Sequence, residues 1–267
     1  MASPSNEITL KFQREINRIS DSDRNTRKSG LKKLLENLPW NTTNTEEAEA
    51  LRLTCKEVIF EPLLTTLVDP VEKCRECSLG LLTKIVHLFR TDLDFQSLST
   101  LASILCSRVN DTPFPETSEE LRFQVIQLLR TLCPFIFHET ALPTEVKSMS
   151  EMIIPAVGKA LVDLFPDVKK GCSEIIIDMG KLTTTDAIRA HYKILLKGLI
   201  VNASHQHYKV RSLAIKVSAM YPISTVVQFR SALFFCCSFI HSFIDVYFSC
   251  YCASLCSAVY MCIYNRH

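Results

Sequence analysis

The chain has 267 residues, of which 47% are hydrophobic and 22% charged, with only 6 glycines and 11 prolines. That is enough apolar material for a sizeable core, and so few helix breakers in a long chain favour helices. The formal net charge of +2 argues against a dominant nucleic-acid-binding surface, which concentrates a large basic excess on one face. We therefore expect no nucleic acid partner.

The start of the chain indicates the compartment. Residues 1–6 are small and polar and lack the charged and apolar regions of a secretory signal, so we expect a cytoplasmic protein with reduced thiols. Within residues 1–228 the cysteines stand singly among apolar positions, apart from one C-x-x-C: Cys55, Cys74, Cys77, Cys106, Cys133 and Cys172. Buried thiols are expected there rather than a disulfide framework.

Charged residues recur at a regular spacing along residues 1–228. Five times, a basic residue follows an acidic or polar one by six positions: Asp21 and Arg27, Asp69 and Arg75, Glu116 and Arg122, Asp163 and Lys169, His205 and Arg211. The interval from each basic residue to the next is nearly constant over the first four copies and slightly shorter before the fifth. Self-similarity at such a period indicates an array of repeated supersecondary units.

Each period contains two amphipathic helices, because its apolar residues follow the i, i+3, i+4, i+7 spacing. In chain order these stretches are 8–19 and 31–38, 58–67 and 79–86, 98–105 and 126–133, 153–161 and 172–180, and 194–200 and 213–217. Short polar joints at 20–23, 69–70 and 165–167 offer N-cap and turn residues, and 39–46, 112–118 and 138–144 are longer joints. A single hairpin cannot bury its own apolar faces. The predicted fold is an all-α solenoid of about five stacked helical hairpins.

This pattern resembles HEAT repeats. The resemblance rests on two helices in about 40–47 residues, an Asp near the joint, and Val168-Lys169 and Val210-Arg211 opening the second helix. In that family the acidic and basic residues form a ladder between neighbouring repeats, which agrees with opposite charges recurring along a stack. The resemblance implies that the five charged pairs fix the register of the repeats and do no chemistry.

Three segments of the chain resemble one particular group of HEAT-repeat proteins. Ser204–Arg211, Glu119–Leu129 and Leu67–Arg75 are similar, in order and spacing, to the N-terminal repeats of the axonemal dynein assembly factors, which are cytoplasmic HEAT-repeat scaffolds. The likeness spans roughly residues 8–228. It implies a non-enzymatic scaffold in the preassembly of the outer and inner dynein arms of motile cilia. The implied partners are axonemal dynein chains, intermediate chains among them, other assembly factors and cytosolic chaperones.

The end of the chain differs in composition from the rest. Between Arg230 and His267 the only formally charged side chains are Arg230, Asp245 and Arg266, and six of the twelve cysteines lie there. Where family members continue with another hairpin, we expect a divergent Cys/Phe-rich tail at 229–267 after a solenoid at 1–228. Residues 246–264 carry no charge and are long enough for a transmembrane helix, although serine and cysteine dilute them. A genuine C-terminus, a splice or intron product and a membrane segment all remain open for this tail.

The sequence contains few signs of a reactive site. Cys74-x-x-Cys77 has no second cysteine pair at zinc-site spacing in the repeats, and His205-x-His207 has no third ligand that we can name. There is no G-x-S-x-G and no glycine-rich phosphate loop. We therefore expect no catalytic residue, no cofactor and no metal, and so no enzyme.

Partner binding is expected on the second helices, which line the concave face of a solenoid. Exposed polar candidates there are Lys28, Lys32, Glu76, Gln127 and Lys216, and the basic cluster formed by Arg24, Arg27, Lys28, Lys32 and Lys33 is expected to be a solvated helix face. Two other functions stay open: a general HEAT adaptor of the transport or phosphatase type, and a membrane-tethered adaptor using 246–264. Against a transport adaptor, Trp40 is the only tryptophan and lies in a joint.

Overall fold

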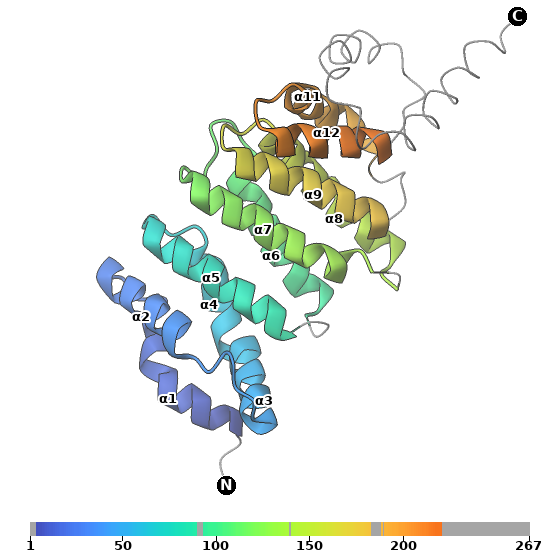
Figure 1. Ribbon diagram of the computed structural model, residues 1–267. Coiled ribbons are helices and arrows are strands. Elements are labelled where there is room, and N and C mark those ends of the chain that lie inside the picture. Colours follow the sequence, from blue (N-terminus) through green and yellow to red (C-terminus); the bar gives the residue numbers. More distant parts are fainter. Residues whose placement is uncertain (1–3, 90–92, 139, 183–187, 189, 221–267) are drawn as a thin grey trace, which may run out of the picture. The chain divides into compact units, whose positions relative to one another are not determined.

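The computed structural model describes residues 4–89, 93–138, 140–182, 188 and 190–220. These residues form five helical hairpins that follow one another along the chain (Figure 1). The first and second helices of the hairpins are α1 (Pro4–Arg18) and α2 (Arg24–Asn37); α3 (Thr45–Thr54), η1 (Cys55–Ile59) and α4 (Phe60–Thr66), followed by α5 (Glu72–Phe89); α6 (Phe95–Val109) and α7 (Glu119–Ile136); α8 (Pro143–Ala160) and α9 (Pro166–Leu182); and α11 (Tyr192–Ala203) and α12 (Tyr208–Met220). The prediction of an all-α repeat solenoid is confirmed.

The second helices stack in chain order. Helix α2 packs on α5, α5 on α7, α7 on α9 and α9 on α12, while α8 lies between α6 and α11 among the first helices. In Figure 1 helices α5, α7 and α9 follow one another side by side, with α6 and α8 behind them. Each of the three inner hairpins therefore buries its apolar faces against the hairpins before and after it, as repeat proteins do.

Helix starts are set by short polar side chains in the joints. Asp23 accepts a hydrogen bond from the Thr26 amide at 2.8 Å, and Asp94 accepts one from the Ser97 amide at 2.8 Å. Asn44 accepts from the amides of Glu46 and Glu47. Each of these side chains satisfies an amide that has no carbonyl partner in the first turn of its helix, which stabilises that helix end.

The second hairpin has a longer first helix than the apolar pattern predicts. The pattern indicated a joint at 39–46 and an apolar stretch at 58–67, but helix begins at Thr45 under the Asn44 cap and continues through a π-helical turn, Cys55–Ile59, into α4. Pro62 has no N–H to bond the carbonyl four residues earlier, and a register change is one way in which a helix accommodates that loss. The segment Thr45–Glu49 is mostly polar, so the spacing of apolar residues does not indicate a helix there.

Two glycines let α8 and α11 cross closely. A Cβ placed on Gly158 would lie 2.5 Å from Ile194 Cγ2, and one placed on Gly198 would lie 2.5 Å from Leu161 Cβ. Neither distance leaves room for a methyl group. Glycine at these positions is therefore part of the contact between the fourth and fifth hairpins.

Contacts divide the chain into one unit at Met1–Tyr221 and a second at Pro222–His267. The predicted boundary at 228/229, the tail and the candidate membrane segment 246–264 all lie outside the described residues, and they stay predictions. Within the described part of the chain, no helix is both long enough and apolar enough to pass through a bilayer.

Candidate functional site

The acidic residues at the predicted ladder positions sit in the turns between paired helices, and the basic residues lie in the first turns of the second helices. Each acidic side chain first caps its own turn by accepting the backbone amide two residues ahead. Asp69 accepts from Val71 at 2.7 Å, Glu116 from Ser118 at 3.2 Å and Asp163 from Phe165 at 2.8 Å. This local bond holds each carboxylate in place at the start of a second helix.

The arginine six residues later closes the same turn from the other side. Its Nη1 donates to the carbonyl of the acidic residue and to the carbonyl that follows. These bonds join Arg27 to Asp21 and Ser22, Arg75 to Asp69 and Pro70, and Arg122 to Glu116 and Thr117, at 2.9–3.3 Å. The six-residue spacing in the sequence is thus the reach of a guanidinium back over its own turn.

The other edge of each guanidinium bonds the carboxylate of the next repeat. Nε and Nη2 of Arg27 donate to Asp69 at 2.6 and 3.2 Å, those of Arg75 to Glu116 at 2.6 and 2.7 Å, and those of Arg122 to Asp163 at 2.6 and 3.0 Å. Such two-point bonds define the relative orientation of both groups. The structure therefore joins ladder residues of adjacent hairpins at three steps: Arg27 to Asp69, Arg75 to Glu116 and Arg122 to Asp163.

Glu116 is the most highly bonded of these carboxylates. Besides Arg75 it accepts a bond from Arg108 Nη2 at 3.1 Å, and its side chain is 2% exposed. Burial alone would raise the pKa of Glu116, but the bonds from Arg75, the Ser118 amide and Arg108 outweigh burial and hold the pKa below its ordinary value. The same balance, with Arg27 and the Val71 amide as donors, lowers the pKa of Asp69.

The fourth step between repeats uses a different pair. Lys169 Nζ donates to Asn202 Oδ1 at 3.0 Å, and Asn202 Nδ2 donates to the Leu161 carbonyl at 2.9 Å. Asn202 is fully buried, and burial lowers the pKa of Lys169. Sequence reasoning missed Asn202. The available signal was a lone amide among the apolar residues of the last turn of helix α11.

His205, the predicted fifth partner, remains within its own turn. Its Nδ1 accepts the His207 amide at 3.1 Å, and the two imidazoles stack with centroids 5.3 Å apart. Burial, followed by the charge of Lys169, lowers the pKa of His205. Arg211 Nη1 donates to the carbonyls of His205 and Gln206, both at 2.8 Å. The fifth turn is thus closed in the same way as the first three.

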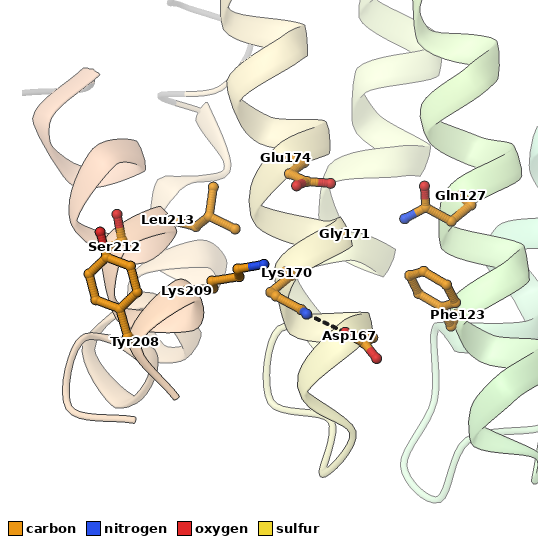
Figure 2. Close-up of a pocket in the computed structure, with 10 residues that line it drawn as sticks. All are labelled: Phe123, Gln127, Asp167, Lys170, Gly171, Glu174, Tyr208, Lys209, Ser212 and Leu213. Atoms are coloured by element: carbon orange, nitrogen blue, oxygen red, sulfur yellow. Dashed lines mark ion pairs between the residues drawn. The ribbon is translucent and has the colours of Figure 1, made fainter. Parts of the chain in front are cut away.

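A shallow groove runs across three successive second helices beside this ladder (Figure 2). Its volume is about 460 Å³, and it is lined by Phe123 and Gln127 of α7, Asp167, Lys170, Gly171 and Glu174 of α9, and Tyr208, Lys209, Ser212 and Leu213 of α12. Gly171 permits α9 to approach α7, because a Cβ there would lie 2.7 Å from Ile126 Cγ2. Of the predicted partner-facing residues, Gln127 lines this groove.

The groove presents aromatic, aliphatic and charged groups together. Tyr208 is 71% exposed, and Lys209 is exposed with no ion-pair or hydrogen-bond partner among the described residues. Lys170 pairs with Asp167, and Glu174 pairs with Arg130. Arg130 Nε also bonds Asp178 at 2.8 Å, so charged contacts continue along the faces of α7 and α9 beyond the groove.

The C-x-x-C cysteines lie inside the repeat core. Cys74 and Cys77 are 0% and 3% exposed, and burial raises the pKa of both thiols. Across the part of the chain that the structure describes, no group of three or more His, Cys, Asp or Glu side chains is placed to hold a metal ion. In the basic cluster, Arg27 belongs to the ladder, while Lys32 and Lys33 lie 3.7 and 4.0 Å from Glu36 and Glu15.

Comparison with known proteins gives a family match. The model of the family described as dynein axonemal assembly factor 5-like, TPR repeats, matches residues 18–232. Dynein axonemal assembly factor 5 of Xenopus laevis is 28% identical over 230 residues, and that of Mus musculus is 26% identical over 229 residues. Each alignment covers 84% of this chain, and the chain spans about a quarter of the length of these relatives.

Solved structures with the same architecture are repeat solenoids. A computationally designed armadillo repeat protein for modular peptide recognition is similar with a TM-score of 0.56 at 15% identity, covering 78% of this chain and 81% of that one. An archaeal HEAT-like repeat protein from Thermococcus onnurineus NA1 gives 0.53 at 14% identity, covering 91% and 84%. At these identities the likeness describes the fold alone.

Proposed function

Since this chain belongs to the dynein axonemal assembly factor 5-like family, we propose that it is a binding scaffold in the assembly of axonemal dynein. The proposal extends to the outer and inner arms of motile cilia, and to preassembly in the cytoplasm. The names of the family and of its relatives support the dynein role. A repeat array supports the scaffold role, because such arrays bind partners along extended faces.

The observation that carries the mechanism is the groove across α7, α9 and α12. It draws its lining from three separate repeats, so a partner lying in it would contact all three at once. Its aromatic and aliphatic groups, Phe123, Tyr208 and Leu213, would supply apolar contact. Lys209 would supply a positive charge that no described carboxylate neutralises. A polypeptide segment with apolar side chains and a carboxylate fits this chemistry.

We assign the protein no reaction of its own. The thiols of the described repeats are buried, with raised pKa values, and a thiol that stays protonated is a poor nucleophile. Arg27, Arg75 and Arg122 and the carboxylates of Asp69, Glu116 and Asp163 bond one another and backbone groups, so these charged groups are already engaged within the fold. The activity proposed is therefore binding of dynein chains, intermediate chains among them, in company with other assembly factors and cytosolic chaperones.

The experiment compares the tagged full chain with two lysine variants in ciliating cells. Lys209→Glu changes the groove on α12, and Lys193→Glu makes the same change on an exposed position of the first helix α11. Captured proteins are identified by mass spectrometry. We expect axonemal dynein chains with the wild type and Lys193→Glu, and at least about tenfold less with Lys209→Glu, the scale of one important interface contact.

The two parts of the proposal fail differently. Equal capture by all three proteins would refute the groove as the binding surface while keeping the dynein role. Capture of transport cargo or phosphatase subunits instead of dynein chains would refute the dynein role for this chain.

A further inference from the structure

Aliphatic side chains are exposed in the joint between α8 and α9. Leu164 is 93% exposed and Val162 47% exposed, while Phe165 and Pro166 beside them are only partly covered. Surface turns consist mostly of Gly, Pro, Asn, Asp and Ser, so two exposed aliphatic side chains in one short joint are unusual. Leu164 has almost no packing role in the fold. Exposed apolar side chains that gather at one place are typical of a surface that binds another protein.

A cavity lies beside this joint, between the start of α9 and the start of α12. Its volume is about 340 Å³, and we call it the turn pocket; it is lined by Phe165, Pro166, Asp167, Lys170, His207, Tyr208 and Lys209. Four of these residues, Asp167, Lys170, Tyr208 and Lys209, also line the groove across α7, α9 and α12. Figure 2 shows Asp167 and Tyr208 at the end of the groove where α9 and α12 begin. The groove and the turn pocket are therefore neighbouring parts of one surface.

The charges of the turn pocket favour a negatively charged ligand. Lys170, His207 and Lys209 bring nitrogen groups to its lining, and Asp167 is the one carboxylate among its described lining residues. Asp167 is already paired with Lys170, and the Lys209 ammonium has no ion-pair partner among the described residues. Helices α9 and α12 both begin at this pocket, so the positive ends of their dipoles add to the attraction. A carboxylate from a ligand would thus pair with Lys209 without a competing acid.

Apolar and cationic groups together select a polypeptide as the ligand. A phosphate or a nucleic acid would use the charge of Lys209 but would find no partner in the aliphatic Leu164 and Val162. A purely apolar ligand would cover Lys209 without pairing it, and an unpaired charge is costly to bury. An acidic polypeptide segment satisfies both kinds of group, because it can carry an apolar side chain next to a carboxylate. Tyr208, which is 71% exposed, adds an aromatic ring of the kind that contributes most to such interfaces.

We propose that the turn pocket, with Leu164 at its rim, binds an acidic polypeptide segment in which an apolar or aromatic residue lies close to Asp or Glu. The apolar side chain packs on Phe165 and Tyr208, and the carboxylate pairs with Lys209. Neighbouring residues of the segment cover Leu164. This binding mode rests on the proposed function of the groove and extends that site to the joints between the helices.

The test uses the purified full chain and requires no dynein. A phage library of short random peptides is selected on the immobilised protein, and enriched peptides are synthesised and measured by fluorescence anisotropy. We expect enriched peptides to carry an apolar or aromatic residue close to Asp or Glu. Leu164→Ser and Lys209→Glu should each weaken binding about tenfold. Because Leu164 is almost fully exposed, its substitution should leave the fold intact. Leu10→Ser, at a leucine of α1 that is 71% exposed, is the control and should bind as the wild type does.

Several results would overturn this binding mode. They are no enrichment, enriched peptides rich in Lys and Arg, and equal binding by the wild type and Leu164→Ser. A dimer in solution that Leu164→Ser dissociates would show that a second copy of the chain occupies the pocket instead.

Capture from ciliating cells separates this binding mode from the proposed function. Equal capture of dynein chains by the wild type and Leu164→Ser would refute the turn pocket and keep the dynein role. Selection of acidic peptides that Leu164→Ser no longer binds, with no dynein captured by the wild type, would refute the dynein role and keep the turn pocket.

Discussion

Arg75 and Glu116 stand 41 positions apart in the sequence and are joined by two hydrogen bonds of 2.6 and 2.7 Å. Arg108, outside the repeating pattern, adds a third bond to the same carboxylate at 3.1 Å. Glu116 therefore ties together α5, α6 and the turn before α7. No other described ladder carboxylate bonds two arginines.

Glu116→Gln should lower the free energy of unfolding by about 2 kcal/mol. The substitution keeps the shape but leaves two largely buried guanidinium groups facing a neutral amide, and uncompensated buried charge is costly. Urea denaturation of the full chain would measure the loss. Glu57→Gln, at an exposed carboxylate without a described partner, is the control and should change stability by less than about 0.5 kcal/mol. Equal stability of the two variants would contradict this account.

Stability should decrease in acid because of the same carboxylates. The pKa values of Asp69 and Glu116 are lower in the folded chain than the ordinary values of 3.8 and 4.5. The unfolded chain therefore binds protons more readily, and the stabilisation is complete above the ordinary values and is lost as pH falls through the folded pKa values. Unfolding free energies between pH 7 and pH 3 would show the decrease. Glu116→Gln should flatten it, and an unchanged slope would count against Glu116 as a source.

Two glycine-to-alanine substitutions should have opposite effects. Gly198→Ala would place a methyl group 2.5 Å from Leu161 Cβ, an atom next to the backbone that cannot rotate away, and should cost about 1–3 kcal/mol. Gly80→Ala would place its methyl group 3.4 Å from the flexible δ-carbons of Leu35. The free energy of unfolding of that variant should rise by up to about 1 kcal/mol, because alanine has a higher helix propensity than glycine. Thermal melting of both would distinguish close packing from propensity, and destabilisation by both would refute the distinction.

The thiols of the repeats should resist alkylation in the native chain. Cys55, Cys106 and Cys133 are buried, and burial raises the pKa of each to about 12. Few of these thiols are ionised at pH 8, so iodoacetamide should modify them quickly only after denaturation. Peptide mass mapping of native and denatured samples would measure this. Rapid native modification of Cys74 and Cys77 would instead indicate an accessible dithiol in the C-x-x-C segment.

Most of the fold could be predicted from the repeat spacing, because the same long-period pattern occurs in five copies. It identified the hairpins and the positions of the charged residues that the structure brings together at Arg27, Arg75 and Arg122. It could not identify α3, whose start at Thr45 depends on the Asn44 cap and a charged surface sequence. Asn202 also escaped, since a neutral amide in place of an acid breaks the charge pattern.

The groove could be identified only from the structure and not from the sequence. Phe123, Gly171 and Tyr208 come from three repeats, and no sequence spacing states that their faces align. Gln127 was named among exposed second-helix residues, but nothing in the sequence separated it from Lys28 or Lys216. The reason is physical: the hydrophobic period determines which side of each helix is buried, and the shape of the exposed side depends on how neighbouring helices approach.

The order of donors and acceptors in the ladder gives the array a direction. The guanidinium groups of Arg27, Arg75 and Arg122 each bond forward to the next hairpin, so the first turn offers the carboxylate of Asp21 with no described arginine before it, and the last described turn offers Arg211. The two ends are chemically unlike and complementary. A duplicated hairpin inserted among the first four would find an acceptor on one side and a donor on the other, which is a simple way for such arrays to lengthen during evolution without redesign of their joints.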